Sequence, residues 1–208
     1  MLETDLRFAF DYVDPGSYLA AVLLERYKPQ LHGSVQVTWI PLELSPPWAA
    51  SIDVRAPAWT KMTNAICEQA KREAVLFHTP VLVPRTRKAH ELALHAKEKG
   101  CFEAVHRALF EAQFQEGTDI GRIDVLVEIG AIAGLERSET RTVLGVDRFG
   151  PVVSALRSDA LAEGIRGVPT ITGPNGAIEG FQDSESFFDF LETVADGGPS
   201  SGDSDRPK

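Results

Sequence analysis

Two polar residues, Asp14 and Ser17, stand three positions apart in the sequence D-P-G-S, just before a run of apolar residues at helical spacing. An aspartate before a proline at the first helical position favours a helix start, so Asp14 is expected to cap the helix. A carboxylate in this place could also act as an acid, a base or a ligand anchor. The helix dipole and nearby N–H groups predict a lowered pKa for Asp14, which would make it a poor general base.

Ser17 is expected in the first turn of the same helix. Its hydroxyl could donate a hydrogen bond to a ligand, or it could bond to Asp14 or the backbone as a capping partner. No histidine stands near it in sequence to make it a nucleophile. A capping role is therefore favoured over a catalytic one for both residues.

The other chemically useful residues point to fewer possibilities. Cys67 and Cys101 are far apart and neither belongs to a C-x-x-C motif, so both are expected to be reduced and structural. His90, His95 and His106 do not share a metal-ligand spacing, so no metal is expected.

The net charge of −9, with no strongly basic stretch, argues against a nucleic-acid partner. No apolar run approaches the length that spans a bilayer, and residues 1–10 lack the pattern of a signal peptide. We therefore expect a cytoplasmic protein with no membrane partner.

The elements that must position these residues begin with alternating apolar residues over 6–12 and 35–41, which predict two strands. The helix expected over 18–27 lies between them. This β-α-β unit implies parallel strands with a right-handed crossover. After a proline-rich loop at 45–57 the pattern becomes helical, with helices expected at 59–77, 85–99, 102–115, 123–133, 136–144 and 147–163.

The last part of the chain predicts a strand at 167–172, a turn at 173–176, a returning strand at 177–180 and a helix capped by Asp183. The whole order is that of an α/β thioredoxin fold, β-α-β followed by α-β-β-α, with an all-helical subdomain inserted. The expected divisions are 1–45 and 147–195 for the two halves of the thioredoxin fold, 58–146 for the insertion and 196–208 for a disordered tail.

Three stretches resemble the DsbA family, particularly its FrnE-like branch. Residues 10–19 (FDYVDPGSYL) resemble the segment that carries D-x-x-C-P-W-C-Y, and 85–92 with 108–120 resemble the helical insertion of that family. Residues 164–170 (GIRGVPT) are similar to its cis-proline loop. The resemblance implies a cis bond between Val168 and Pro169, in a loop beside Asp14.

The resemblance fails at the reactive site, because Asp14 and Ser17 occupy the positions of the two cysteines. Thiol–disulfide exchange needs a thiolate and a second thiol. The dithiol oxidoreductase activity of the family therefore cannot be transferred to this chain.

A related branch, the kappa-class glutathione transferases and the 2-hydroxychromene-2-carboxylate isomerases, also lacks the cysteine pair and has a serine at the first position. Here that position is Asp14, whose negative charge would repel the glutathione thiolate. If the chain were such a transferase or isomerase, its cofactor would be glutathione.

The resemblance makes Val168, Pro169, His90 and Asp11 the candidate ligand-binding residues, with the backbone of Val168 free to pair with an extended ligand. The leading hypothesis is a protein without redox activity that binds a peptide, a thiol or a small aromatic acid in a cleft between core and insertion. The alternatives are the glutathione-dependent transferase or isomerase and a chaperone-like role. The sequence is also compatible with a homodimer.

Overall fold

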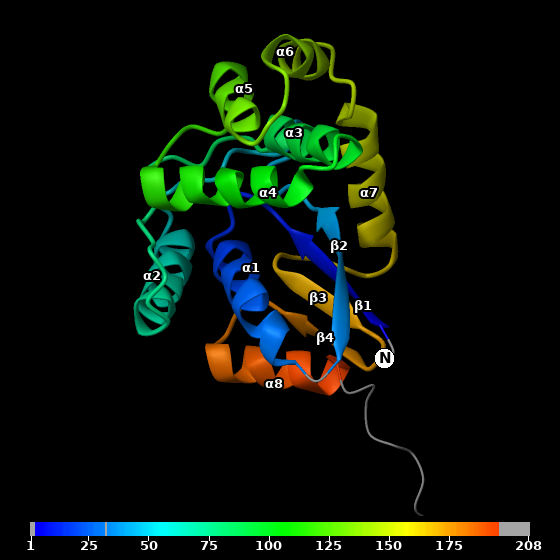
Figure 1. The fold of residues 1–208 in the computed structure, drawn as a ribbon. Coiled ribbons are helices and arrows are strands. Elements are labelled where there is room, and N and C mark those ends of the chain that lie inside the picture. Colours follow the sequence, from blue (N-terminus) through cyan, green and yellow to red (C-terminus); the bar gives the residue numbers. More distant parts are fainter. Residues whose placement is uncertain (1–2, 32, 196–208) are drawn as a thin grey trace, which may run out of the picture.

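A mixed sheet of four strands forms the centre of the molecule, in the order β2-β1-β3-β4 (Figure 1). The computed structural model describes residues 3–31 and 33–195, so the tail expected at 196–208 lies outside the described residues. β1 pairs in parallel with β2 and antiparallel with β3, and β3 pairs antiparallel with β4. The strands are β1 Glu3–Phe10, β2 Ser34–Pro41, β3 Thr170–Gly173 and β4 Gly176–Glu179.

The helices confirm the predicted order, with a block of helices between the two halves of the sheet (Figure 1). They are α1 Pro15–Tyr27, α2 Pro57–Arg72, α3 Arg87–Glu98, α4 Phe102–Glu111, α5 Ile123–Ile132, α6 Arg137–Gly145, α7 Gly150–Ala162 and α8 Ser184–Ala195. A 3-10 turn η1, Lys28–Gln30, follows α1, and a π-helical segment η2, Ala112–Glu116, continues α4.

The alternation along β1 divides the core into two layers. Leu6, Phe8 and Phe10 point into the main cluster, which α1, α8 and the inserted helices share. Ala9 points the other way, into a smaller cluster with Ala160 of α7. Successive side chains of a strand lie on opposite faces, which is why one strand serves both layers.

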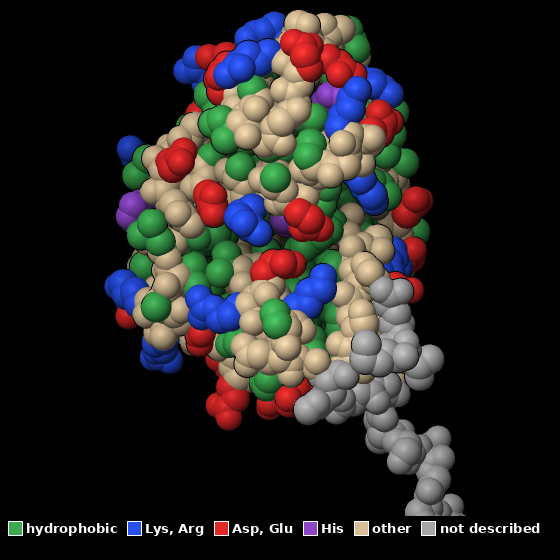
Figure 2. Space-filling model, in the orientation of Figure 1, with side chains coloured by type: hydrophobic (Ala, Val, Ile, Leu, Met, Phe, Trp, Pro, Cys, Tyr) green, Lys and Arg blue, Asp and Glu red, His purple; other side chains and the backbone are tan. Residues whose placement is uncertain are grey.

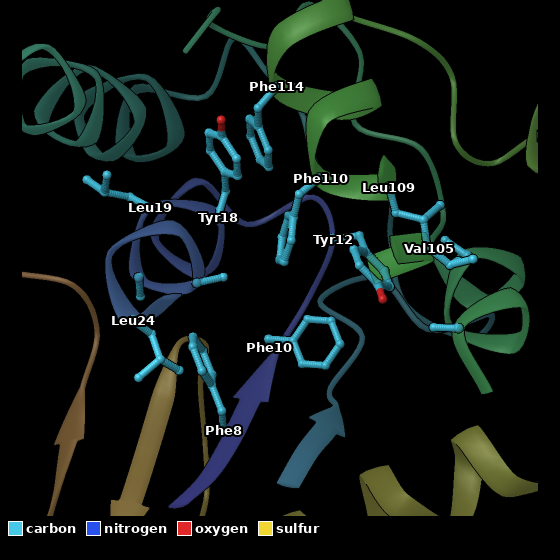
Figure 3. Packing of buried hydrophobic residues seen from close by; sticks show 14 of the residues in the cluster. Phe8, Phe10, Tyr12, Tyr18, Leu19, Leu24, Val105, Leu109, Phe110 and Phe114 are labelled. Carbon is cyan, nitrogen blue, oxygen red and sulfur yellow. The ribbon is translucent and has the colours of Figure 1, made fainter. Parts of the chain in front are cut away.

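The aromatic residues join the sheet to the insertion. Phe8 and Phe10 of β1 lie below the ring of Tyr12, and Phe110 and Phe114 reach down from α4 and η2 toward α1 (Figure 3). Phe110 and Phe114 are 2% and 0% exposed, so both belong to the core. The packing makes the thioredoxin half and the insertion share a single core.

Several element ends differ from the prediction by a few residues, among them the starts of α1, β3 and α7. β1 ends at Phe10 rather than at Tyr12, and α2 ends at Arg72 rather than near residue 77. The end of α2 lacks the usual glycine signal: Ala74 takes a positive φ of 52°, and the Val75 amide bonds to the Ala70 carbonyl at 2.8 Å. This is a helix-terminating geometry that normally uses glycine, so the sequence did not reveal it.

In the described part of the chain, no helix combines the length and the apolar character that crossing a membrane requires.

Candidate functional site

The start of α1 is built around Asp14 and Ser17. The Ser17 amide donates a 2.6 Å hydrogen bond to Asp14 Oδ2, which confirms the predicted cap. The Ser17 hydroxyl accepts a hydrogen bond from the Asp11 amide at 3.4 Å. Asp14 is 2% exposed and Ser17 is fully buried, so this pair is enclosed by protein.

The loop with Val168 and Pro169 lies directly against this helix start. A Cβ on Gly16 would come within 2.9 Å of Pro169 Cδ, so the proline ring packs on the first turn of α1. The Val168–Pro169 peptide bond is cis. Within residues 3–31 and 33–195, no hydrogen bond engages the backbone N–H or C=O of Val168, whereas the Pro169 carbonyl accepts the Gly180 amide at 2.7 Å.

Asp11 connects the site to the insertion. Its Oδ2 accepts the Leu44 amide at 2.7 Å, and its Oδ1 lies 3.2 Å from Nε2 of His90 on α3. Asp11 and His90 are both fully buried. The Asp11 side chain therefore holds the loop after β2 and the first turn of α3 to the end of β1. It also orients the His90 ring, with Nε2 toward Asp11.

The predicted lowering of the pKa of Asp14 is wrong. Burial raises the pKa of Asp14 from 3.8 to about 7, against the hydrogen bonds from Ser17 and the Gly16 amide, which lower it. Desolvation penalises the charged form of a carboxyl group and here exceeds the effect of the cap. Near neutral pH the group can exchange a proton, as a general acid or base must. The argument that a permanent negative charge repels a thiolate therefore loses its basis.

Two cavities lie between the thioredoxin core and the inserted helices. One cavity of about 350 Å³ lies between α1 and α4, and another of about 390 Å³ lies between β2, α3 and α7. Of the six predicted site residues, His90 alone lines either one, the second. Pro169 packs on the first turn of α1, and Asp14 is 2% exposed.

The sequence did not lead us to predict that His106 lines the first cavity. We had considered this residue only as a metal ligand. His106 lines the cavity between α1 and α4, together with Trp39 and Phe110. The signal was present: Phe102, His106 and Phe110 recur at a spacing of four, one turn apart on a single helix face. Among the described residues, no three histidine, cysteine or acidic side chains gather as a metal site would require.

These features define a thioredoxin fold with a helical insertion and a proline loop packed on the first helix. The family model of the DSBA-like thioredoxin domain matches residues 5–193, and the chain belongs to this family. The uncharacterised protein YwbO of Bacillus subtilis is 28% identical over 183 residues, 85% of this chain and 90% of that protein.

Solved structures share the fold. A probable DsbA oxidoreductase from Streptomyces coelicolor aligns with a TM-score of 0.81 and 24% identity, over 96% of this chain and 93% of the other. A 2-hydroxychromene-2-carboxylate isomerase aligns with a TM-score of 0.74 and 16% identity, over 89% and 92%. The cytosolic disulfide reductase DsbM from Pseudomonas aeruginosa, solved with GSH, gives 0.61 and 18%, over 91% and 98%. At these identities the likeness concerns the fold alone.

Proposed function

We propose that this chain is a member of its family without dithiol chemistry that binds an extended backbone, of a peptide or of glutathione, at Val168. The observation that carries the proposal is the unpaired backbone N–H and C=O of Val168, in the described part of the chain, beside the start of α1. An extended ligand can pair with two such groups as an added strand. Because positions 14 and 17 carry no thiol, we propose that the Val168–Pro169 loop binds a ligand and takes no part in disulfide exchange.

The redox half of the proposal has a direct test. The protein should not reduce insulin, because neither Asp14 nor Ser17 can attack or resolve a disulfide. The matched control is the double variant Cys67→Ala/Cys101→Ala, which removes both thiols of the chain. Insulin reduction above background by both proteins would overturn this half.

The binding half is tested with S-methylglutathione, which has the backbone but no thiol, and with a short extended peptide. Titration should shift the backbone amide resonance of Val168. Val168→Pro removes the N–H donor and should abolish binding, whereas Val168→Ile keeps it and should bind normally. Binding of S-methylglutathione alone identifies glutathione as the ligand, binding of the peptide alone identifies a peptide, and an unmoved Val168 amide with both probes refutes the proposal.

A second candidate function is a glutathione-dependent isomerase with Asp14 as acid and base. It is favoured by the Asp14 carboxyl itself, whose pKa burial raises to about 7, and by the likeness in fold to the isomerase. Conversion of 2-hydroxychromene-2-carboxylate in the presence of glutathione, lost in Asp14→Asn, would support it. No turnover by the unaltered protein would remove it.

The cytoplasm remains our proposal for the compartment, supported by a neighbour in fold that is a cytosolic disulfide reductase.

A further inference from the structure

β2 is the outer strand on one side of the sheet, because in the order β2-β1-β3-β4 it pairs with β1 alone. The Leu42 amide, one residue past the end of β2, donates a 2.9 Å hydrogen bond to the Phe10 carbonyl of β1. The backbone groups of successive residues in a strand point to opposite sides. The groups of Ile40 therefore face β1, as the Leu42 amide does. The groups of Val37 and Trp39 face the free edge of the sheet.

The outward backbone groups at this edge have no partner in the described part of the chain. No hydrogen bond there engages the N–H or the C=O of Val37 or Trp39. β2 lies with α1 on one side and α7 on the other (Figure 1). Figure 2, in the same orientation, shows a hollowed surface on this side of the molecule, where hydrophobic side chains lie between charged ones. The edge can therefore accept another extended chain.

The sequence of β2 lacks the features that usually protect an edge strand. Its eight residues, S-V-Q-V-T-W-I-P, include no charged side chain, and the proline comes last. The opposite edge, β4, has four residues and ends on Glu179. Edge strands in natural proteins are commonly kept short, or carry charges or prolines that prevent pairing with another chain. β4 follows this rule, whereas β2 is open to pairing over most of its length.

A groove of about 390 Å³ follows the free edge, and five consecutive residues of β2, 37–41, line it. The Trp39 ring lies on the side of the main core, 6.4 Å between centroids from the Phe102 ring, which also lines the groove. On the side of α7 the groove is lined by Leu156 and Asp159. Successive side chains of an added strand would lie on these two sides in turn, one side aromatic and the other carrying a carboxylate.

The charges of the groove favour a basic partner. Arg7 and Glu163 line it and pair with each other. Glu103, Asp159 and Lys97 also line it, and within the described residues none of these three belongs to an ion pair. Two acidic groups therefore stand against one basic group, in a chain whose net charge is −9.

The walls of the groove limit what can reach the edge. Side chains of both α3 and α7 line the groove beside β2. A second copy of the chain would bring its own α3 and α7 along with its β2, yet paired strands must approach to about 4.8 Å. Residues 196–208 have no apolar side chain other than proline to offer the aromatic side. A single extended segment of another protein meets neither obstacle.

We propose that the free edge of β2 binds an extended segment of a partner protein in which apolar and basic side chains alternate. The segment adds a strand to the sheet through the backbone groups of Val37 and Trp39. Its apolar side chains lie toward Trp39 and Phe102, and its basic side chains lie toward Asp159. No residue of the Val168 loop lines this groove, so the site stands whether or not that loop binds a backbone.

Two end-blocked peptides test the chemistry of the partner by fluorescence anisotropy. T-V-K-V-K-V-T has the proposed alternation, and T-V-E-V-E-V-T reverses its charge. The lysine peptide should bind the unaltered protein more tightly. Asp159→Lys should weaken the lysine peptide about threefold or more and favour the glutamate peptide. The matched control Asp189→Lys makes the same charge change at an exposed position of α8, outside the groove, and should keep the original preference.

Backbone methylation of the lysine peptide tests strand addition itself. One version carries N-methyl groups on its valines and the other on its lysines, so each loses the N–H donors of one edge and keeps its side chains. Only one edge of an added strand faces β2. One version should therefore bind about tenfold or more weakly than the other.

Hydrogen exchange of single amides, followed by NMR, locates the added strand. In the free protein the amides of Val37 and Trp39 should exchange fast and the Ile40 amide slowly, because only Ile40 is paired with β1. The lysine peptide should slow the exchange at Val37 and Trp39. The Val168 amide reports on the other proposed site separately.

Equal affinities of the two N-methylated peptides, or exchange at Val37 and Trp39 that the lysine peptide leaves unchanged, would overturn the proposal. Slow exchange at these two amides in the free protein would also overturn it, because the edge would then be covered by the chain itself or by a second copy. So would the lack of binding by the lysine peptide at a Kd of about 1 mM or tighter.

Discussion

The start of α1 and the cavity between α1 and α4 both bury a titratable side chain, but they treat it in opposite ways. Asp14 has its hydrogen bonds supplied by the protein and is enclosed by the Pro169 loop. His106 has one nitrogen paired with Tyr12, and its other nitrogen is buried with no hydrogen-bond partner among the described residues. The polar group at the start of α1 has its hydrogen bonds supplied by neighbouring residues, whereas the buried imidazole of α4 has one nitrogen that no described residue pairs.

The same comparison predicts opposite pH dependences. Burial raises the pKa of Asp14 and lowers that of His106, because desolvation disfavours the charged form of an acid and of a base alike. The two effects oppose one another in the free energy of unfolding between about pH 4 and pH 6.5. Each should therefore become visible when the other residue is replaced.

The largest expected effect is that of His106→Phe. The folded pKa of about 3 lies below the unfolded value of 6.5, so the unfolded state binds more protons in this window and stability rises with pH. The stability of the unaltered protein minus that of the variant should increase by about 5 kcal/mol from pH 3 to pH 6.5. Urea unfolding at a series of pH values measures it, with the exposed His78→Phe as control. A constant difference would contradict the account.

Asp14→Asn should show the reverse trend, with a slightly smaller size. The folded pKa of about 7 lies above the unfolded 3.8, so the folded state holds the proton longer and stability falls as pH rises through this window. The unaltered protein should lose about 4 kcal/mol relative to the variant between pH 4 and pH 7. The same urea series checks this, and a relative gain of stability by the unaltered protein would mean that burial does not dominate at Asp14.

Asp11→Ala should lower the free energy of unfolding by about 3 kcal/mol at neutral pH. The substitution leaves the Leu44 amide and the buried His90 Nε2 without their partner. Asp11→Asn keeps an acceptor oxygen and should cost less. Chemical unfolding measures both, and equal losses would show that the carboxyl oxygens themselves contribute little.

The smallest expected effect compares two helix caps. Asp183 caps α8 from an exposed position, where its Oδ1 accepts the Ser186 amide at 2.8 Å and this bond lowers its pKa. Asp183→Ala should lower the free energy of unfolding only slightly at neutral pH, because water replaces the lost cap at this exposed position. Asp14→Ala removes a similar cap but also a buried carboxyl group, so its cost should be greater at pH 5 than at pH 8. Thermal unfolding at the two pH values distinguishes the caps, and parallel behaviour would argue against the role of burial.

The sequence by itself determined the order of the elements, the family, and both helix caps. Strand alternation, helical spacing and the D-P-G-S motif act over a few residues, so a linear chain displays them. Boundaries were less accurate where a residue took an unusual conformation, as Ala74 does at the end of α2. The meeting of Pro169 with the first turn of α1 was expected through the family resemblance and through no local pattern.

Only the tertiary structure decided the direction of the pKa shift at Asp14 and the role of His106. The cap of Asp14 comes from the next three residues, but its desolvation comes from burial in the packed molecule, where the Pro169 loop lies against the first turn of α1. His106 likewise depends on Tyr12 and Trp39, which are distant in sequence. Local hydrogen bonds are encoded in adjacent residues, whereas burial is a property of the packed molecule, and at Asp14 burial outweighs the local hydrogen bonds.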